Sequence, residues 1–213
     1  MYEAHPPERS ADAEAHAPER RSRTKRRTAA GELWEWTKAI VIAVVLSYLV
    51  RTFLFAPTIV DGESMMDTLL NHERVIVNKL IYHVEAPKRG EIIVFHATPD
   101  KDFIKRVIGV AGDRIEMKND TLYINGQAVD EPYLNDNKAL WKKELAAAHM
   151  DGAVPYTEDF IVDRVPDGTV FVLGDNRRNS TDSRVLGPVP VDRVIGRAEF
   201  VFWPLERFRW LHP

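Results

Sequence analysis

"TLYINGQAV", residues 121–129, indicates the class of the fold. Two short runs rich in β-branched and aromatic side chains flank the dipeptide Asn125-Gly126. That dipeptide favours the two-residue turn of a β-hairpin, because both of its residues tolerate a positive φ. The stretch therefore predicts two adjacent antiparallel strands.

Similar runs lie on both sides of this hairpin, each rich in Val, Ile, Phe or Tyr and bounded by Gly, Pro or Asp. They are "RVIVNKLIY" (74–82), "GEIIVFHA" (90–97), "DFIKRVIGV" (102–110), "DRIEM" (113–117), "GTVFVLGD" (168–175) and "VIGRAEFVFW" (194–203). Residues 131–163 break the rhythm, since "NKALWKKELAAAHM" has helical composition. We expect a mainly β, antiparallel domain over residues 57–213 with an insertion or surface subdomain at 131–163.

The composition is that of an ordinary globular protein, with 45% hydrophobic and 29% charged residues among 213. The net charge of -3 gives no reason to expect a nucleic-acid partner. The chain has no cysteine, which excludes disulfides, cysteine zinc sites and a thiol nucleophile. The seven histidines form no zinc-binding spacing, and no metal or cofactor is expected.

The N-terminal part differs in character from the β domain. Residues 1–32 are rich in Ala, Pro, Glu and Arg, predict a disordered tail, and end in the basic cluster "ERRSRTKRR". No residue from Ala39 to Val50 is charged, and the 23 residues from Leu33 to Phe55 suffice to span about 30 Å of hydrocarbon. We therefore expect a single transmembrane anchor at residues 33–56.

The basic cluster before this apolar run predicts a cytoplasmic N-terminus and a catalytic or binding domain outside the plasma membrane. A buried helix of a soluble domain is the alternative interpretation of the run. A cleavable signal peptide fits less well, because no small-x-small site follows the apolar core.

Three stretches carry candidate chemistry: "DGESMMDTLLN" (61–71), "FIKRVIGVAGDRI" (103–115) and "GDNRRNSTDSR" (174–184). Each has an ordinary explanation when taken alone. Ser64 suits a helix N-cap, Lys105 suits an exposed strand position, and the third stretch suits a polar loop or a calcium site. A Ser-His-Asp triad is not excluded by residue counts, but no serine lies in a G-x-S-x-G context.

Taken together and in this order behind an anchor, the stretches resemble the motifs of the type I signal peptidases. "VDGESM..TL" is similar to the family's nucleophile motif, "FIKRVIGVAGD" to its lysine motif, and "GDNRRNSTDSR" with the following "LGPVP...VIGRAEFVFWP" to its third motif. The resemblance implies an antiparallel, β-barrel-like signal-peptidase fold and a membrane-bound serine endopeptidase without cofactor or metal. It also implies substrates that are signal peptides of secretory preproteins, cut after Ala-x-Ala, at a lipid bilayer.

The resemblance assigns roles to individual residues. Ser64 would attack the scissile carbonyl, Lys105 would take its proton, and the N–H of Ser64 with help around Gly62 would form the oxyanion hole. Ser180 would orient Lys105 through a hydrogen bond. Asp175, Asp182 and Arg184 would hold the surroundings of the site, and Val60, Met65, Leu69, Phe103 and Ile104 would line the substrate pockets.

A lysine acts as a base only when it is neutral, and its ordinary pKa of about 10.4 prevents that near pH 7. Lowering this pKa to about 7 costs about 4.6 kcal/mol, which burial away from water can supply. Lys105 follows Phe103 and Ile104 and precedes "VIGV" by one residue. Arg106 would alternate to the opposite face of the strand.

Two positions depart from the family pattern, because Asp67 and Ala111 stand where prolines are expected. A carboxylate facing Lys105 would favour the ammonium form and weaken the base. We expect Asp67 to point to solvent. Two other functions compete with the peptidase: a self-cleaving Ser/Lys repressor-type protease, disfavoured because no DNA-binding domain precedes the site, and a catalytically impaired membrane-anchored binding protein of the same fold.

Overall fold

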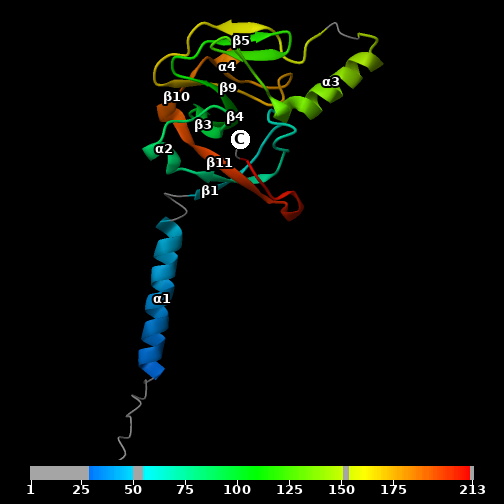
Figure 1. The fold of residues 1–213 in the computed structure, drawn as a ribbon. Coiled ribbons are helices and arrows are strands. Elements are labelled where there is room, and N and C mark those ends of the chain that lie inside the picture. The colour runs from blue at the N-terminus through cyan, green and yellow to red at the C-terminus, as the bar shows by residue number, and fades with distance from the viewer. Residues whose placement is uncertain (1–28, 50–54, 151–153, 212–213) are drawn as a thin grey trace, which may run out of the picture. The chain divides into compact units, whose positions relative to one another are not determined.

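The structure is a computed structural model that describes residues 29–49, 55–150 and 154–211 (Figure 1). The chain divides into two compact units, residues 1–43 and 44–213, and each is described by itself. Most of the predicted tail, residues 1–28, lies outside the described residues.

Helix α1 runs from Ala29 to Leu49. It begins four residues earlier than the predicted anchor, at Ala29 and Ala30, which favour a helix. Beyond Leu49 the predicted anchor falls on residues 50–54, which lie outside the described residues. Among the helices of the described residues, none is long and apolar enough to cross a membrane.

The larger of two antiparallel sheets contains eight strands, in the order β1-β2-β11-β3-β4-β9-β10 with β12 paired to β11. Its strands are β1 (Phe55–Ile59), β2 (Arg74–Asn78), β3 (Ile92–Thr98), β4 (Lys101–Val110), β9 (Thr169–Leu173), β10 (Val189–Pro190), β11 (Val194–Trp203) and β12 (Arg209–Trp210). Strand β4 lies between β3 and β9, so Lys105 pairs with Ile93 in the interior of the sheet.

The smaller sheet has four strands in the order β7-β6-β5-β8. They are β5 (Ile115–Lys118), β6 (Thr121–Ile124), β7 (Gln127–Val129) and β8 (Phe160–Val162). The predicted hairpin is confirmed, because β6 and β7 pair around Asn125 and Gly126, which both have positive φ. All the predicted runs contain strands, although "RVIVNKLIY" ends as a strand at Asn78 and continues into helix α2 (Ile81–Val84).

Three apolar clusters form the core. One is centred on β2 and β11 and includes Met65 and Leu69 from the loop between β1 and β2. A second joins the two sheets, with Phe171 and Leu173 of β9 packed against Ile115 and Met117 of β5 and their neighbours. The third lies along β3, β4 and β9. Strand β4 contributes to the second and third clusters, so Lys105 is carried by a strand that is fixed on both sides.

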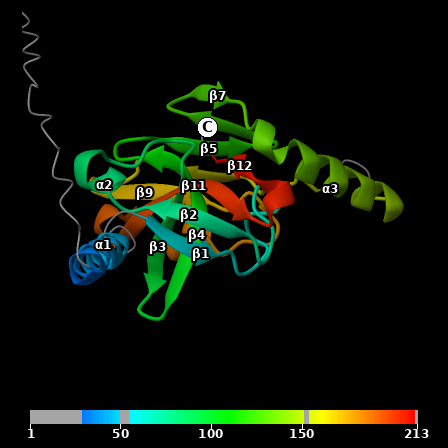
Figure 2. The same ribbon diagram turned by 90° about the horizontal axis from the view of Figure 1, so that it is seen from below.

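The section from 131 to 163 contains the 3-10 helix η2 (Pro132–Leu134), the predicted helix α3 (Asn135–Ala147) and β8. Figures 1 and 2 show α3 extending outward from the β domain. The section is not a separate surface subdomain, because β8 pairs with β5 and Leu134, at the start of α3, is completely buried. The remaining short helices are α4 (Ser183–Leu186), η3 (Val191–Arg193) and η4 (Leu205–Arg207).

Candidate active site

The structure brings Ser64 and Lys105 into direct contact. The Lys105 Nζ donates a hydrogen bond to Ser64 Oγ at 2.7 Å and another to the carbonyl oxygen of Ile104 at 2.9 Å. Ser64 lies in the loop between β1 and β2, and Lys105 lies in the middle of β4. The two residues are 41 positions apart in the sequence, so only the folded sheet places them together.

The surroundings of Lys105 favour its neutral form. Only 3% of the residue is exposed, and burial lowers the pKa of Lys105 from 10.5 to about 8 against the opposing charges of Asp182 and Asp175. The Phe103 ring lies 5.0 Å from Nζ and adds apolar surface. A lysine with such a pKa is a usable general base at slightly alkaline pH, because a substantial fraction is then deprotonated.

The loop that carries Ser64 is a series of tight turns rather than a helix. Met66 N bonds to the carbonyl oxygen of Glu63 at 3.1 Å, and Leu69 N bonds to that of Met65 at 2.8 Å. The explanation of Ser64 as a helix N-cap is therefore wrong. Instead, Ser64 O accepts the backbone N–H of Asn176 at 3.0 Å, which ties the serine directly to the third motif.

Gly174 allows the third motif to approach Ser64 this closely. A Cβ on Gly174 would lie 2.2 Å from Ser180 Oγ and 2.4 Å from the carbonyl oxygen of Ser64. Ser180 Oγ is buried over this glycine and faces the Asp182 carboxylate, whose pKa it helps to lower. In the described residues Lys105 Nζ bonds to Ser64 and Ile104 rather than to Ser180, and a role of Ser180 in orienting Lys105 stays a prediction.

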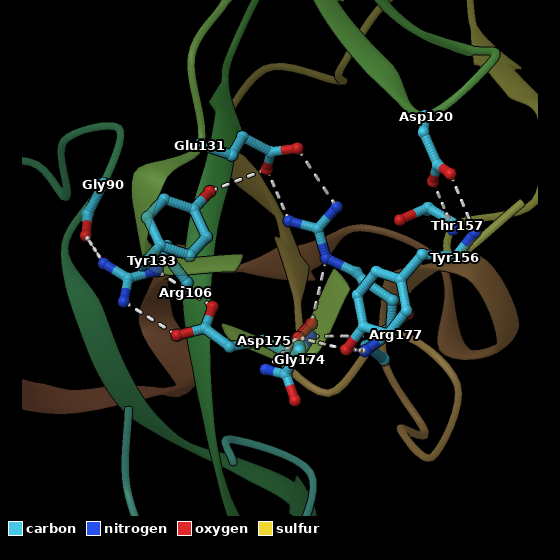
Figure 3. Close-up of polar contacts among 12 residues, drawn as sticks. Gly90, Arg106, Asp120, Glu131, Tyr133, Tyr156, Thr157, Gly174, Asp175 and Arg177 are labelled. Carbon is cyan, nitrogen blue, oxygen red and sulfur yellow. Dashed lines mark hydrogen bonds and ion pairs between the residues drawn. The ribbon is translucent and has the colours of Figure 1, made fainter. Parts of the chain in front are cut away.

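Asp175 connects the third motif to two other segments, and Figure 3 shows its contact with Arg106. Its carboxylate, which is fully buried, accepts Arg106 Nε at 2.9 Å and Nη2 at 2.8 Å. It also accepts the hydroxyl of Thr68 at 2.5 Å, four residues beyond Ser64. Arg106 points away from the Lys105 side of β4, as expected, but its pairing with Asp175 was not foreseen.

Asp182 holds the other end of the third motif. It caps α4, accepting Arg184 N at 3.2 Å and the Arg184 guanidinium at 2.8 and 2.9 Å, and it also accepts Gly174 N at 3.0 Å. Burial alone would raise the pKa of Asp182, but Arg184 and Gly174 N outweigh it and the pKa lies below its usual value. Asp182 and Arg184 therefore fix this end of the third motif, and the charge of Asp182 acts on Lys105.

Gly62 has φ +108°, which favours glycine. Its N–H donates to Asn71 Oδ1 at 3.0 Å, so this donor is already engaged within the loop. Gly62 therefore shapes the loop that presents Ser64, and its predicted help in the oxyanion hole stays a prediction.

A cleft of about 340 Å³ opens in front of Ser64 and Lys105. Val60, Phe103 and Ile104 line it, as predicted. Met65 and Leu69 do not line it; they are 1% and 0% exposed and belong to the core, because their side chains anchor the Ser64 loop from beneath. The cleft is completed by residues that were not predicted, namely Thr58, Ile59, Asp61, Glu63, Val94, Asp102, Asn179 and Thr181.

The expectation that Asp67 points to solvent is wrong. Its Oδ2 is buried and has no hydrogen-bond partner among the described residues, because Asn137 and Tyr156 lie close to this part of the loop. The charge of Asp67 acts on Tyr156, whose pKa is raised to about 12, mainly by burial. Asp67 is not among the charges that act on Lys105. Ala111 is exposed in the turn after β4.

A serine hydroxyl bonded to a buried lysine is a nucleophile and base arrangement of serine peptidases. Residues 33–203 match the family model described as "Signal peptidase, peptidase S26". The chain therefore belongs to the signal peptidase family, peptidase S26, and is a serine peptidase whose substrates are the signal peptides of preproteins.

Two relatives illustrate the similarity. The chain is 50% identical over 176 residues to "Signal peptidase I S" of Bacillus subtilis, covering 82% of this chain and 91% of that protein. It is 40% identical over 189 residues to "Signal peptidase IB" of Staphylococcus aureus, covering 84% and 94%. A crystal structure of a signal peptidase I from Enterococcus faecalis aligns with TM-score 0.45 and 36% identity, covering 54% of this chain and 97% of that one.

Proposed function

We propose that the chain is a signal peptide endopeptidase in which Ser64 is the nucleophile and Lys105 is its general base. The observation that carries the proposal is the 2.7 Å contact between Lys105 Nζ and Ser64 Oγ. A serine alcohol needs a base within this distance to become nucleophilic. The lowered pKa of Lys105 makes that base available without a metal or an organic cofactor.

The reaction follows from this geometry. Neutral Lys105 takes the Ser64 proton as Oγ attacks the scissile carbonyl, and the resulting ammonium then protonates the leaving amine. An acyl group remains on Ser64, and a water attacks it with Lys105 again accepting the proton. The backbone N–H of Ser64 has no hydrogen-bond partner among the described residues, so it can donate to the oxyanion as the charge develops.

We propose that the cleft selects substrates with small residues at the first and third positions before the cut, as in Ala-x-Ala. Ile104, Val94 and Phe103 narrow the cleft beside the catalytic pair. Strands β3 and β4, which carry these three residues, pair with each other within the larger sheet. We therefore expect these side chains to move little when a substrate binds. Forcing bulky side chains into packed surroundings costs about 1–3 kcal/mol.

We further propose that residues 33–56 associate with the lipid bilayer, with the N-terminus in the cytoplasm and the catalytic domain outside. The support comes from the uncharged run from Ala39 to Val50 and from apolar side chains that α1 leaves exposed along its length. These side chains include Trp34, Trp36, Ile40, Val44 and Tyr48. Tryptophan favours the interface between lipid and water.

The test is cleavage in detergent of a preprotein ending its signal peptide in Ala-x-Ala, compared with its Phe-x-Phe variant. Wild type should release the mature protein and Ser64→Ala should not. The Phe-x-Phe variant should be cleaved about tenfold to hundredfold more slowly. Equal cleavage by wild type and Ser64→Ala would refute Ser64 as the nucleophile, whereas absence of cleavage by wild type would favour the alternative of an impaired binding protein. Equal cleavage of the two substrates would refute only the assignment of the cleft.

The pH dependence of the reaction provides a second test. Because only neutral Lys105 accepts a proton, kcat/KM should fall about tenfold per pH unit below its pKa of about 8 and level off above it. Asp67→Asn should leave this ascending limb of the profile of kcat/KM against pH in place, since Asp67 does not act on Lys105. Asp182→Asn, if folded, should move the limb to lower pH, because the Asp182 carboxylate favours the ammonium form. A limb that moves with Asp67→Asn would contradict this account.

A further inference from the structure

Residues 131–137 and Tyr156 lie outside the three motifs, yet Glu131, Asn137 and Tyr156 contact the third motif (Figure 3). Two ion pairs lie in this region, Arg177 with Glu131 and Arg106 with Asp175. The side chains of all four residues are at most 6% exposed. Buried charges hold their partners in place strongly, because breaking such a pair leaves an uncompensated charge.

Glu131 and Tyr133, at the start of the section, contact both guanidinium groups. Glu131 accepts Arg177 Nη1 at 3.4 Å, Arg177 Nη2 at a shorter distance, and the Tyr133 hydroxyl at 2.7 Å. The Tyr133 ring lies 3.9 Å from Arg106 Cζ. Burial alone would lower the pKa of Arg177, but Glu131 outweighs it and the pKa is raised. Arg177 is therefore a permanent cation fixed by this section.

Asn137, in the first turns of α3, reaches further toward the reactive loop. Its Nδ2 donates to the carbonyl oxygen of Met66 at 2.6 Å and lies 3.4 Å from that of Asp175. The same Asp175 carbonyl accepts the Tyr156 hydroxyl at 3.0 Å, and Arg177 N donates to this hydroxyl at 3.1 Å. One side-chain amide of α3 thus bridges the Ser64 loop and the third motif.

These contacts converge on the serine. Ser64 O accepts Asn176 N at 3.0 Å, and Thr68 donates to the carboxylate of Asp175 at 2.5 Å. Asp175 and Asn176 therefore hold the Ser64 loop on one side. Asn137 and Tyr156 in turn bond to the carbonyl oxygen of Asp175. The distance from Ser64 Oγ to Lys105 Nζ depends on this arrangement, and a misplacement of about 1 Å can cost about a hundredfold in rate.

We propose that Asn137 is a positioning residue for Ser64, and that Glu131, Asn137 and Tyr156 form the support through which the Ser64 loop keeps its reactive geometry. The proposal rests on the proposed function, in which Ser64 and Lys105 carry out the cleavage. Asn137 touches no reacting atom; it acts through the carbonyl oxygen of Met66, two residues after Ser64. Only 9% of Asn137 is exposed. If its amide donor were removed, water would therefore not freely replace the hydrogen bond to Met66.

Asn137→Ala and Asn137→Asp test the proposal against Asn135→Ala, which changes an exposed asparagine two residues earlier in the same helix. Asn137→Ala removes the donor, and we expect kcat to fall about tenfold with KM within twofold. Asn137→Asp keeps the shape but sets a carboxylate against two carbonyl oxygens, so its kcat should fall further. The pH limb of kcat/KM should stay in place in Asn137→Ala, since the surroundings of Lys105 are unchanged. Asn135→Ala should behave as wild type.

A role in filling space alone predicts the opposite order, with the isosteric Asn137→Asp milder than Asn137→Ala. That order, or a folded Asn137→Ala with kcat within twofold of wild type, would overturn the proposal. Thermal melts establish the folded fraction, and if Asn137→Asp does not fold, Asn137→Ala decides the question. Wild type and Ser64→Ala in the same assay separate a failure of the proposed function from a failure of the positioning role. If wild type does not cleave, the proposed function is refuted. If Asn137→Ala cleaves as wild type does, only the positioning role is refuted.

Discussion

Lys105→Arg should abolish cleavage, although the substitution keeps the positive charge and nearly keeps the length of the side chain. A guanidinium does not deprotonate in the accessible pH range, so it cannot take the proton of Ser64. Removing general base catalysis costs about a hundredfold to ten-thousandfold. The measurement is kcat/KM on a preprotein from pH 6 to pH 10, where the variant should show no ascending limb.

Lys101→Arg is the matched control, because Lys101 is an exposed lysine of the same strand and should tolerate the change. Near-normal turnover by Lys105→Arg would show that the base lies elsewhere. The Ser64 and Lys105 assignment would then have to be abandoned, whatever the behaviour of Ser64→Ala.

The same lysine should leave a signature in stability. Its pKa falls on folding from 10.5 to about 8, so between these values the unfolded chain binds more protons and stability rises with pH. Each pKa unit corresponds to about 1.4 kcal/mol, so the buried ammonium costs about 3 kcal/mol below pH 8. Lys105→Met, which is never charged, should therefore gain stability over wild type at pH 6 and lose that advantage toward pH 10.5. An advantage independent of pH would contradict the buried ammonium.

The β architecture could be predicted well because each strand carries its own local signal. The predicted runs all contain strands, and the Asn125-Gly126 turn forms as expected. Strand β1 was missed because Phe55 and Ala56 continue the apolar anchor run and Pro57 interrupts the strand pattern. Strand β8 was missed because three residues carry no pattern; its pairing with β5 decides its conformation.

The contact between Ser64 and Lys105 could be expected from the motifs, whereas the surroundings of the pair could be predicted only in part. Met65 and Leu69 are predicted to line the substrate pocket but lie in the core. The sequence does not separate these two locations, because both require apolar side chains. Arg106 was recognised as pointing away from Lys105, but its partner Asp175 is 69 residues distant. Asn137 carries no sequence signal, since its side chain bonds to a backbone carbonyl 71 residues earlier.

Gly174→Ala should reduce activity about a hundredfold, although the new methyl group touches neither reacting atom. It would lie 2.4 Å from the carbonyl oxygen of Ser64 and 2.2 Å from Ser180 Oγ. The Ser180 side chain can turn aside, but the Ser64 backbone must move because a Cβ does not tolerate such an approach. A displacement of about 1 Å at the nucleophile corresponds to about a hundredfold in rate, and the crowding should cost about 1–3 kcal/mol of stability.

Gly126→Ala separates these two effects. Gly126 has φ +81° and open space around it, so alanine there costs about 1–2 kcal/mol in backbone strain in the hairpin of the smaller sheet. Both variants should therefore melt at lower temperature than wild type, but only Gly174→Ala should lose kcat per folded molecule. If both lose activity in proportion to stability, the close approach of Gly174 to Ser64 matters for folding alone. If Gly174→Ala folds and retains wild-type kcat, the Ser64 carbonyl is not held where the hydrogen bond from Asn176 requires it.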